Sequence, residues 1–193
     1  MQITRVISIR ALFFGRMPSV SNDNFGPMVA YLVPGATVLL GIRPYFPALD
    51  RWFAATPPDA PTLGGFLYLT VASLAAGMTV NAVRWAVVDK IHALTGLPPP
   101  VLDFSRLASR EQAFSLLIDI HYKHYQFHSG MLLATAIAYM AYRTYYGFDQ
   151  TTGWLDVSVM GLEVVFFLMS RDTLRKYYTR SKQLLSRENH LPA

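Results

Sequence analysis

The chain has 193 residues, of which 52% are hydrophobic and only 15% are charged. A soluble domain has about 25% charged residues, so this composition favours a membrane protein with several spans. Because the chain contains no cysteine, disulfide bonds, thiolate metal sites and cysteine nucleophiles are excluded. The formal net charge is +5, which in a membrane protein fits orientation of the spans and contact with lipid phosphates better than binding of nucleic acid.

The N-terminal part of the chain is basic and leads into a first predicted span. Residues 1–26 carry three arginines against Asp23 alone, and their apolar runs are too short for a signal peptide. We interpret them as a cytoplasmic tail. Residues 27–43 are predicted to span the membrane, with Pro27 suited to the first turn of a helix. The proline-rich segment 44–65 then forms a loop.

Residues 66–84 form the clearest predicted span, because no formal charge occurs before Arg84. A helix needs about 20 mainly apolar residues to cross the hydrocarbon core, and this run is long enough. Ser73 and Gly77 within it are small residues four positions apart, which lets another helix approach closely. That helix belongs either to the same chain or to a second copy.

Residues 85–128 are predicted to be helical and to lie outside the membrane. The helix of the second span continues to Gly96, since the prolines at 98–100 end it. A new helix begins with Asp103 or Ser105 as its N-cap. No residue breaks this helix before position 129, so we expect it to run directly into the third span.

The third and fourth predicted spans cover residues 130–146 and 154–170. Both are short for a bilayer, so Tyr, Trp and Arg side chains at their ends must anchor them. The tail, residues 171–193, continues as a basic helix. The predicted fold is therefore all-α: one membrane domain, 1–193, with four transmembrane helices and a helical cytoplasmic extension.

The distribution of cations predicts the orientation. Most Lys and Arg residues lie in the two tails and in segment 85–128, whereas Arg43, Arg51 and Arg143 lie on the opposite side of the spans. The positive-inside rule then places both termini in the cytoplasm, in a plasma or inner membrane.

Glu163 lies near the middle of the fourth predicted span, where a charged residue is unusual. An ionised carboxylate at that depth is costly and needs a partner or a proton. Arg84 and Asn81 lie toward the cytoplasmic end of the second span, so we predict an intramembrane polar cluster of Glu163, Arg84 and Asn81. Such a cluster is either a structural contact between helices or part of an ion or proton pathway.

Three histidines precede the third span. His121, His124 and His128 are three and four residues apart, which predicts that their imidazoles share one helical face at the cytoplasmic boundary. Imidazoles so placed could bind a metal or sense pH. The alternative is a belt of His, Tyr and Phe at the headgroup level. The sequence indicates no other cofactor.

Basic residues after the fourth span are predicted to contact lipid headgroups: Arg171, Arg175, Lys176, Arg180 and Lys182. Nucleic acid is the less favoured partner of this segment.

The sequence indicates a binding or transport role more than an enzymatic one. It contains no GxSxG elbow, P-loop or dinucleotide fingerprint. Four spans alone enclose little, so a homo-oligomer is expected. The leading hypothesis is a non-enzymatic membrane protein that forms or regulates a permeation path, or that responds to a cytoplasmic signal or protein partner. The alternatives are a membrane enzyme with the three histidines as metal ligands, and a scaffold that recruits a soluble partner.

Overall fold

A computed structural model describes residues 22–53, 63–148 and 153–185; the predicted N-terminal tail up to residue 21 and residues 186–193 lie outside these ranges. All regular elements within the described ranges are helical, which confirms the all-α prediction. They are α1 (Asn22–Ile42), η2 (Arg43–Tyr45), α2 (Pro47–Phe53), α3 (Leu63–Leu94), η3 (Phe104–Arg106), α4 (Leu107–Leu117), the π-helical η4 (Ile118–Tyr122), α5 (Lys123–Tyr146) and α6 (Trp154–Leu185).

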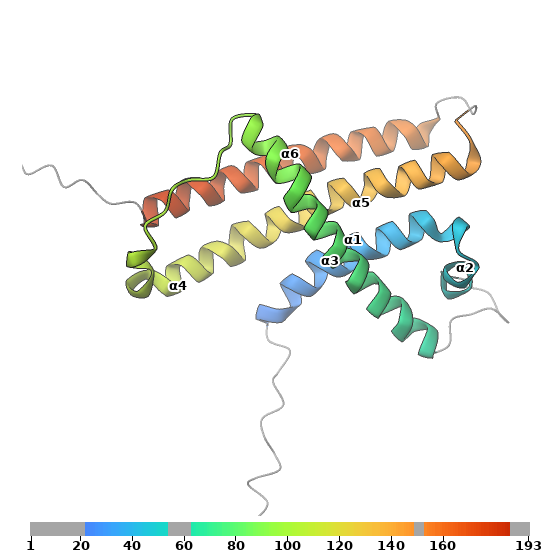
Figure 1. Cartoon of the computed structure of the whole chain (residues 1–193), viewed down its shortest axis with the longest axis horizontal. Helices are drawn as coiled ribbons and strands as arrows, with labels where there is room; N and C mark the ends of the chain where they lie inside the picture. Colours follow the sequence, from blue (N-terminus) through green and yellow to red (C-terminus); the bar gives the residue numbers. More distant parts are fainter. Residues whose placement is uncertain (1–21, 54–62, 149–152, 186–193) are drawn as a thin grey trace, which may run out of the picture.

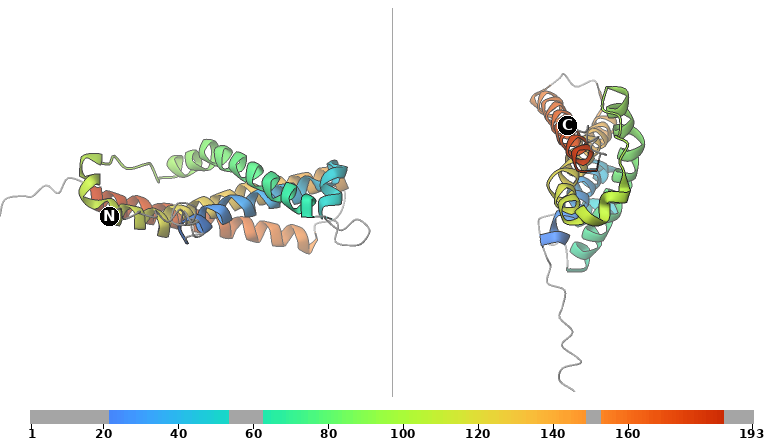
Figure 2. Two further views of the ribbon diagram at one scale, coloured as in Figure 1. Left: turned by 90° about the horizontal axis from the view of Figure 1, so that it is seen from below. Right: turned by 90° about the vertical axis from the view of Figure 1, so that its left-hand side faces the viewer.

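Three long helices form a layer that a fourth helix crosses. Helices α1, α5 and α6 lie side by side, with α5 in the middle, and α3 lies obliquely across one face of this layer (Figures 1 and 2). Helix α6 extends past the level at which α1 begins and packs along α5, η4 and α4. The first half of α6 thus lies beside α5, whereas its second half lies beside η4 and α4, beyond the start of α1.

Helices α1 and α3 meet in direct backbone contact. A Cβ atom placed on Gly77 would lie 1.9 Å from the carbonyl oxygen of Tyr31, and one on Gly35 would lie 1.7 Å from that of Ser73. No side chain fits at either glycine. The predicted small-residue pair, Ser73 and Gly77, is buried in this contact, so its packing partner is α1 of the same chain.

The connection from α3 to α4 follows the predicted signals. Gly96 has a φ of +96°, and the amide of Leu97 donates to the carbonyl of His92 at 2.9 Å, which is the hydrogen bond of a Schellman motif. Asp103 caps the next helix by accepting a hydrogen bond from the amide of Ser105 at 3.1 Å. The predicted end near Gly96 and the predicted cap are both confirmed.

Helical structure then continues from η3 through α4 and η4 into α5, as the absence of breakers predicted. The sequence did not indicate two features of this segment: the helix kinks at Arg110, and residues 118–122 form a π turn. Arg110 donates to the carbonyl of Leu184 at the end of α6. Its side chain therefore satisfies one of the free carbonyls that every helix C-terminus leaves.

Two helical segments, Met28–Tyr45 and Leu63–Leu94, are long and apolar enough to cross a membrane. The first segment covers the first predicted span from Met28 onward, and the second segment contains the whole second predicted span. The third and fourth predicted spans are helical and lie within α5 and α6.

Candidate functional site

The interior of the bundle contains a polar cluster centred on Arg84 of α3. Only 2% of the Arg84 side chain is exposed, and its guanidinium forms an ion pair with Asp89 at 3.0 Å. Its Nε donates to Oδ1 of Asn81 at 2.8 Å. Arg84 and Asn81 are one helical turn apart, whereas Asp89 is five residues away and is reached because the arginine side chain is long. The structure thus brings together two of the three residues of the predicted cluster and adds Asp89.

Tyr125 of α5 completes this cluster. The residue is fully buried, its hydroxyl donates to the same carboxylate oxygen of Asp89, and its ring lies 5.0 Å from the guanidinium carbon of Arg84. Burial, together with the neighbouring carboxylate, raises the pKa of Tyr125. Its phenol therefore stays protonated and acts as a donor, and the ring adds a cation–π contact in a desolvated site.

His92 links α3 to α6 one layer further along the bundle. The imidazole is fully buried, and its Nε2 lies 3.0 Å from Oγ of Ser170. Ser170 donates its hydroxyl proton to the carbonyl of Phe167 at 2.9 Å, so Nε2 of His92 carries the proton of their shared hydrogen bond. Nδ1 of His92 is buried and has no hydrogen-bond partner within the described part of the chain.

Glu163 of α6 is half-buried and accepts a hydrogen bond from Oγ1 of Thr135 on α5 at 2.5 Å. The predicted partners of Glu163, Arg84 and Asn81, bind one another and Asp89 instead. Matching depths in the membrane suggested the pairing, but depth does not fix the direction in which a residue faces around its helix. The hydrogen bonds therefore place Glu163 in the contact between α5 and α6, and Arg84 in the contact between α3 and α5.

The hairpin between α5 and α6 carries a second buried ion pair. Arg143 of α5 and Asp156 of α6 form an ion pair. Asp156 also accepts hydrogen bonds from the hydroxyl of Tyr139 at 2.7 Å and from the amide of Gly153 at 3.0 Å. These bonds satisfy the carboxylate at the start of α6 and hold the two helices together.

The three histidines before the third predicted span have different environments. His121 is buried, His124 is exposed, and His128 is half-buried beside the rings of Phe127 and Phe166. The π turn at residues 118–122 widens the helix just where His121 lies, so the simple three-and-four spacing does not describe its direction. Within the described ranges, no group of three or more His, Cys, Asp or Glu residues is placed to hold a metal.

Sequence reasoning missed Asp89, Tyr125 and His92 as members of the polar interior. One signal could have found the cluster: a buried tyrosine needs a partner for its hydroxyl, and Asp89 is the acidic residue closest to the end of the second predicted span.

The buried charges of this interior are paired with opposite charges. The ion pairs Arg84–Asp89 and Arg143–Asp156 are each completed by hydrogen bonds from neighbouring side chains or backbone. The cluster joins α3 to α5, and His92 joins α3 to α6. Comparisons with protein-family models, curated proteins and solved structures found no match to this chain.

Proposed function

We propose that this chain is a non-enzymatic membrane protein with four spans, and that it forms or regulates a permeation path as a homo-oligomer. The observation that carries the membrane assignment is the abrupt change in surface along α6. Large exposed apolar side chains occupy its first half: Trp154, Leu155, Val157, Met160, Leu162, Val164, Val165, Leu168 and Met169. From Ser170 to Leu185, which are all described, the exposed residues are polar.

The length of this apolar surface supports a span near the lower limit of bilayer thickness. The 16 residues from Trp154 to Met169 rise about 24 Å at 1.5 Å each, against a hydrocarbon core of roughly 30 Å. Helices α1 and α3 supply the two segments that meet the length and hydropathy of a span. Water exposure of so many apolar side chains would be strongly unfavourable, whereas lipid accepts them.

Glu163 supports the permeation hypothesis. Its carboxyl group lies within the apolar surface of α6, is only half-buried, and has one hydrogen bond, from Thr135. An acidic group in lipid is expensive unless it binds a proton, a cation or another polar group. Glu163 is only partly covered by its own chain, so a second copy that packs against the α5–α6 contact would enclose it.

Liposomes test this proposal. We expect the purified protein to conduct protons or small cations when reconstituted, and Glu163→Gln to abolish the flux while the protein still inserts and assembles. The matched control is Glu111→Gln, which removes an exposed carboxylate from α4 and should leave flux unchanged. No flux from the wild-type protein under any condition, or equal flux from wild type and Glu163→Gln, would contradict the permeation hypothesis.

A further inference from the structure

We propose that the second half of α6 carries a binding site for an anionic phospholipid headgroup with at least one phosphate beyond the phosphodiester. The inference rests on the membrane placement proposed above but not on a permeation path. The cationic side chains of the site are Arg175, Lys176 and Arg180, and Thr179 and Gln183 supply further hydrogen-bond donors.

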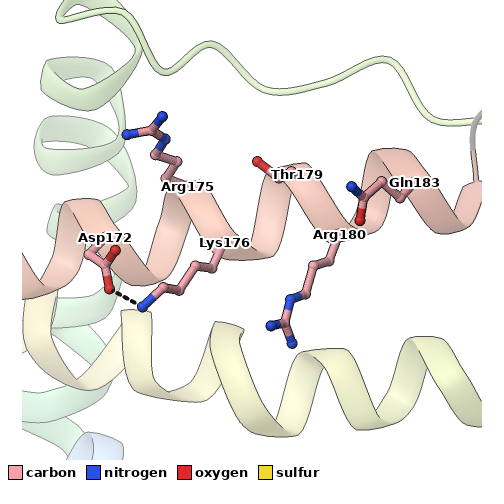
Figure 3. Close-up of a pocket in the computed structure, with 6 residues that line it drawn as sticks. All are labelled: Asp172, Arg175, Lys176, Thr179, Arg180 and Gln183. Atoms are coloured by element: carbon pink, nitrogen blue, oxygen red, sulfur yellow. Dashed lines mark hydrogen bonds and ion pairs between the residues drawn. The ribbon is translucent and has the colours of Figure 1, made fainter.

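The site is a groove along one face of α6. Its volume is about 380 Å³, and its lining residues recur at steps of three and four: Asp172, Arg175, Lys176, Thr179, Arg180 and Gln183 (Figure 3). This spacing places all six on one helical face. Three cations against one carboxylate make the groove positive. Guanidinium, ammonium, hydroxyl and amide groups are together the donors that phosphate oxygens accept from.

The cations of the groove are available to a ligand. Arg175 and Arg180 form no hydrogen bond or ion pair with another described residue. Lys176 pairs with Asp172 at 2.6 Å, but both side chains are about half exposed, at 53% and 50%. An exposed pair of this kind contributes little stability, so an arriving phosphate can displace the carboxylate.

Arg171 differs from these cations because it already has a structural role. Its guanidinium donates to both the hydroxyl and the carbonyl of Thr95, each at 2.6 Å. It therefore fastens α6 to the end of α3. Two of the predicted headgroup ligands are therefore not part of the groove. Arg171 binds Thr95 instead, and Lys182 does not line the groove.

A small recess beside Arg180 gives a second observation in favour of a phosphate ligand. Its side chain turns toward the neighbouring α4–η4 segment (Figure 3), where it lines a recess of about 110 Å³ together with His121 and apolar residues of α4 and η4. Nε2 of His121 is buried there without a hydrogen-bond partner in the described structure. A buried polar atom without a partner is costly, and a phosphate oxygen held by Arg180 would supply the missing acceptor.

The position of the groove relative to the lipid indicates the kind of headgroup. Counted from Ser170, where the exposed apolar surface ends, Arg175 lies about 7.5 Å and Arg180 about 15 Å further along the helix axis. The headgroup layer is roughly 5–8 Å thick on each side of the hydrocarbon core. Helical side chains lean toward the N-terminus, which here means toward the membrane. Arg175 and Lys176 can therefore reach the phosphodiester of a lipid. Arg180 lies farther from the hydrocarbon core, so it can bind only a phosphate attached to the headgroup farther out than the phosphodiester.

The test uses the full-length protein in nanodiscs. We expect discs containing phosphatidylinositol bisphosphate to bind more tightly than discs with phosphatidylserine at equal total charge. Arg180→Gln and Arg175→Gln should each weaken binding about tenfold, the usual effect of losing a charge-assisted hydrogen bond. Lys182→Gln is the matched control: it removes the same charge from an exposed position of the same helix outside the groove, and it should leave affinity nearly unchanged.

Three outcomes would overturn the inference. An equal loss for Lys182→Gln would show diffuse attraction to a charged surface. Equal binding to the two lipids would show that the site does not recognise a phosphate other than the phosphodiester. If soluble inositol trisphosphate or an oligonucleotide bound as tightly as the discs with phosphatidylinositol bisphosphate, the site would not be specific for a lipid. Failure of the protein to enter nanodiscs would contradict the membrane assignment, whereas entry without a headgroup preference would contradict only this inference.

Discussion

The contact between α1 and α3 allows a prediction whose magnitude follows from the structure. In Gly77→Ala, the new Cβ would lie 1.9 Å from the carbonyl oxygen of Tyr31. Non-bonded heavy atoms pack at roughly 3.5 Å, so the two helices would have to separate by about 1.6 Å. Because the opposing atom belongs to the α1 backbone, no side-chain rotation can relieve the clash. The same movement would loosen the adjacent contact of Gly35 with Ser73.

The expected cost is the difference between two effects. Alanine gains about 1 kcal/mol over glycine in helix propensity, whereas overpacking a tight contact costs roughly 1–3 kcal/mol and occasionally more. A backbone clash falls at the upper end, so we expect Gly77→Ala to destabilise by about 2 kcal/mol. Gly161→Ala is the control, since no heavy atom lies within 4 Å of a Cβ at that position of α6. It should be neutral or stabilise by up to about 1 kcal/mol.

Unfolding in mixed micelles with increasing dodecyl sulfate, followed by circular dichroism, measures both variants against the wild type. The free energies of unfolding should differ between them by about 2–3 kcal/mol, with Gly77→Ala the less stable. Equal stability of the two variants would refute the close backbone contact and, with it, the assignment of Ser73 and Gly77 to packing within one chain.

Two further predictions concern charge in the interior. Arg84→Met leaves Asp89 without its cation and should cost about 3 kcal/mol of unfolding free energy, whereas Arg43→Met removes an exposed ion pair and should cost less than about 1 kcal/mol; similar losses in chemical denaturation would contradict the buried pair. Burial, aided by the charge of Arg180, lowers the pKa of His121. Its contribution to stability is therefore complete above pH about 6.5 and is lost as the pH falls, because the unfolded chain takes up the proton first. His121→Gln should flatten the stability profile between about pH 5 and 7; an unchanged slope would show that other groups produce it.

Helix boundaries were predictable because they depend on local chemistry. Gly96 and Asp103 end and begin helices through their own backbone and side-chain properties, and both predictions are confirmed. The pair Arg143–Asp156 was also predictable, since a short connection between α5 and α6 brings the two residues together whatever the rest of the bundle does.

The interior partners were not predictable, because they depend on how helices are rotated and tilted. Helix α3 crosses the layer obliquely (Figure 1), so Arg84 meets Tyr125 of α5. Glu163 meets Thr135 because of the way α6 is rotated against α5. The π turn likewise changes the direction of His121, and hydrophobic periodicity alone gives no signal for such a turn. Composition gave the class of structure, but these contacts required the packed helices.

Cysteine labelling tests the central claim, that half of this bundle lies in a membrane and the other half in the cytoplasm. Because the chain has no cysteine, single substitutions can be read without interference at three exposed positions: Ala48 of α2, Val164 of α6 and Lys182 near the end of α6. With a membrane-impermeant maleimide, we predict that Ala48→Cys is labelled on intact cells and Lys182→Cys only after permeabilisation. Val164→Cys should be labelled only after denaturation. Labelling of Lys182→Cys on intact cells would contradict the orientation, and ready labelling of Val164→Cys in native membranes would contradict the membrane assignment itself.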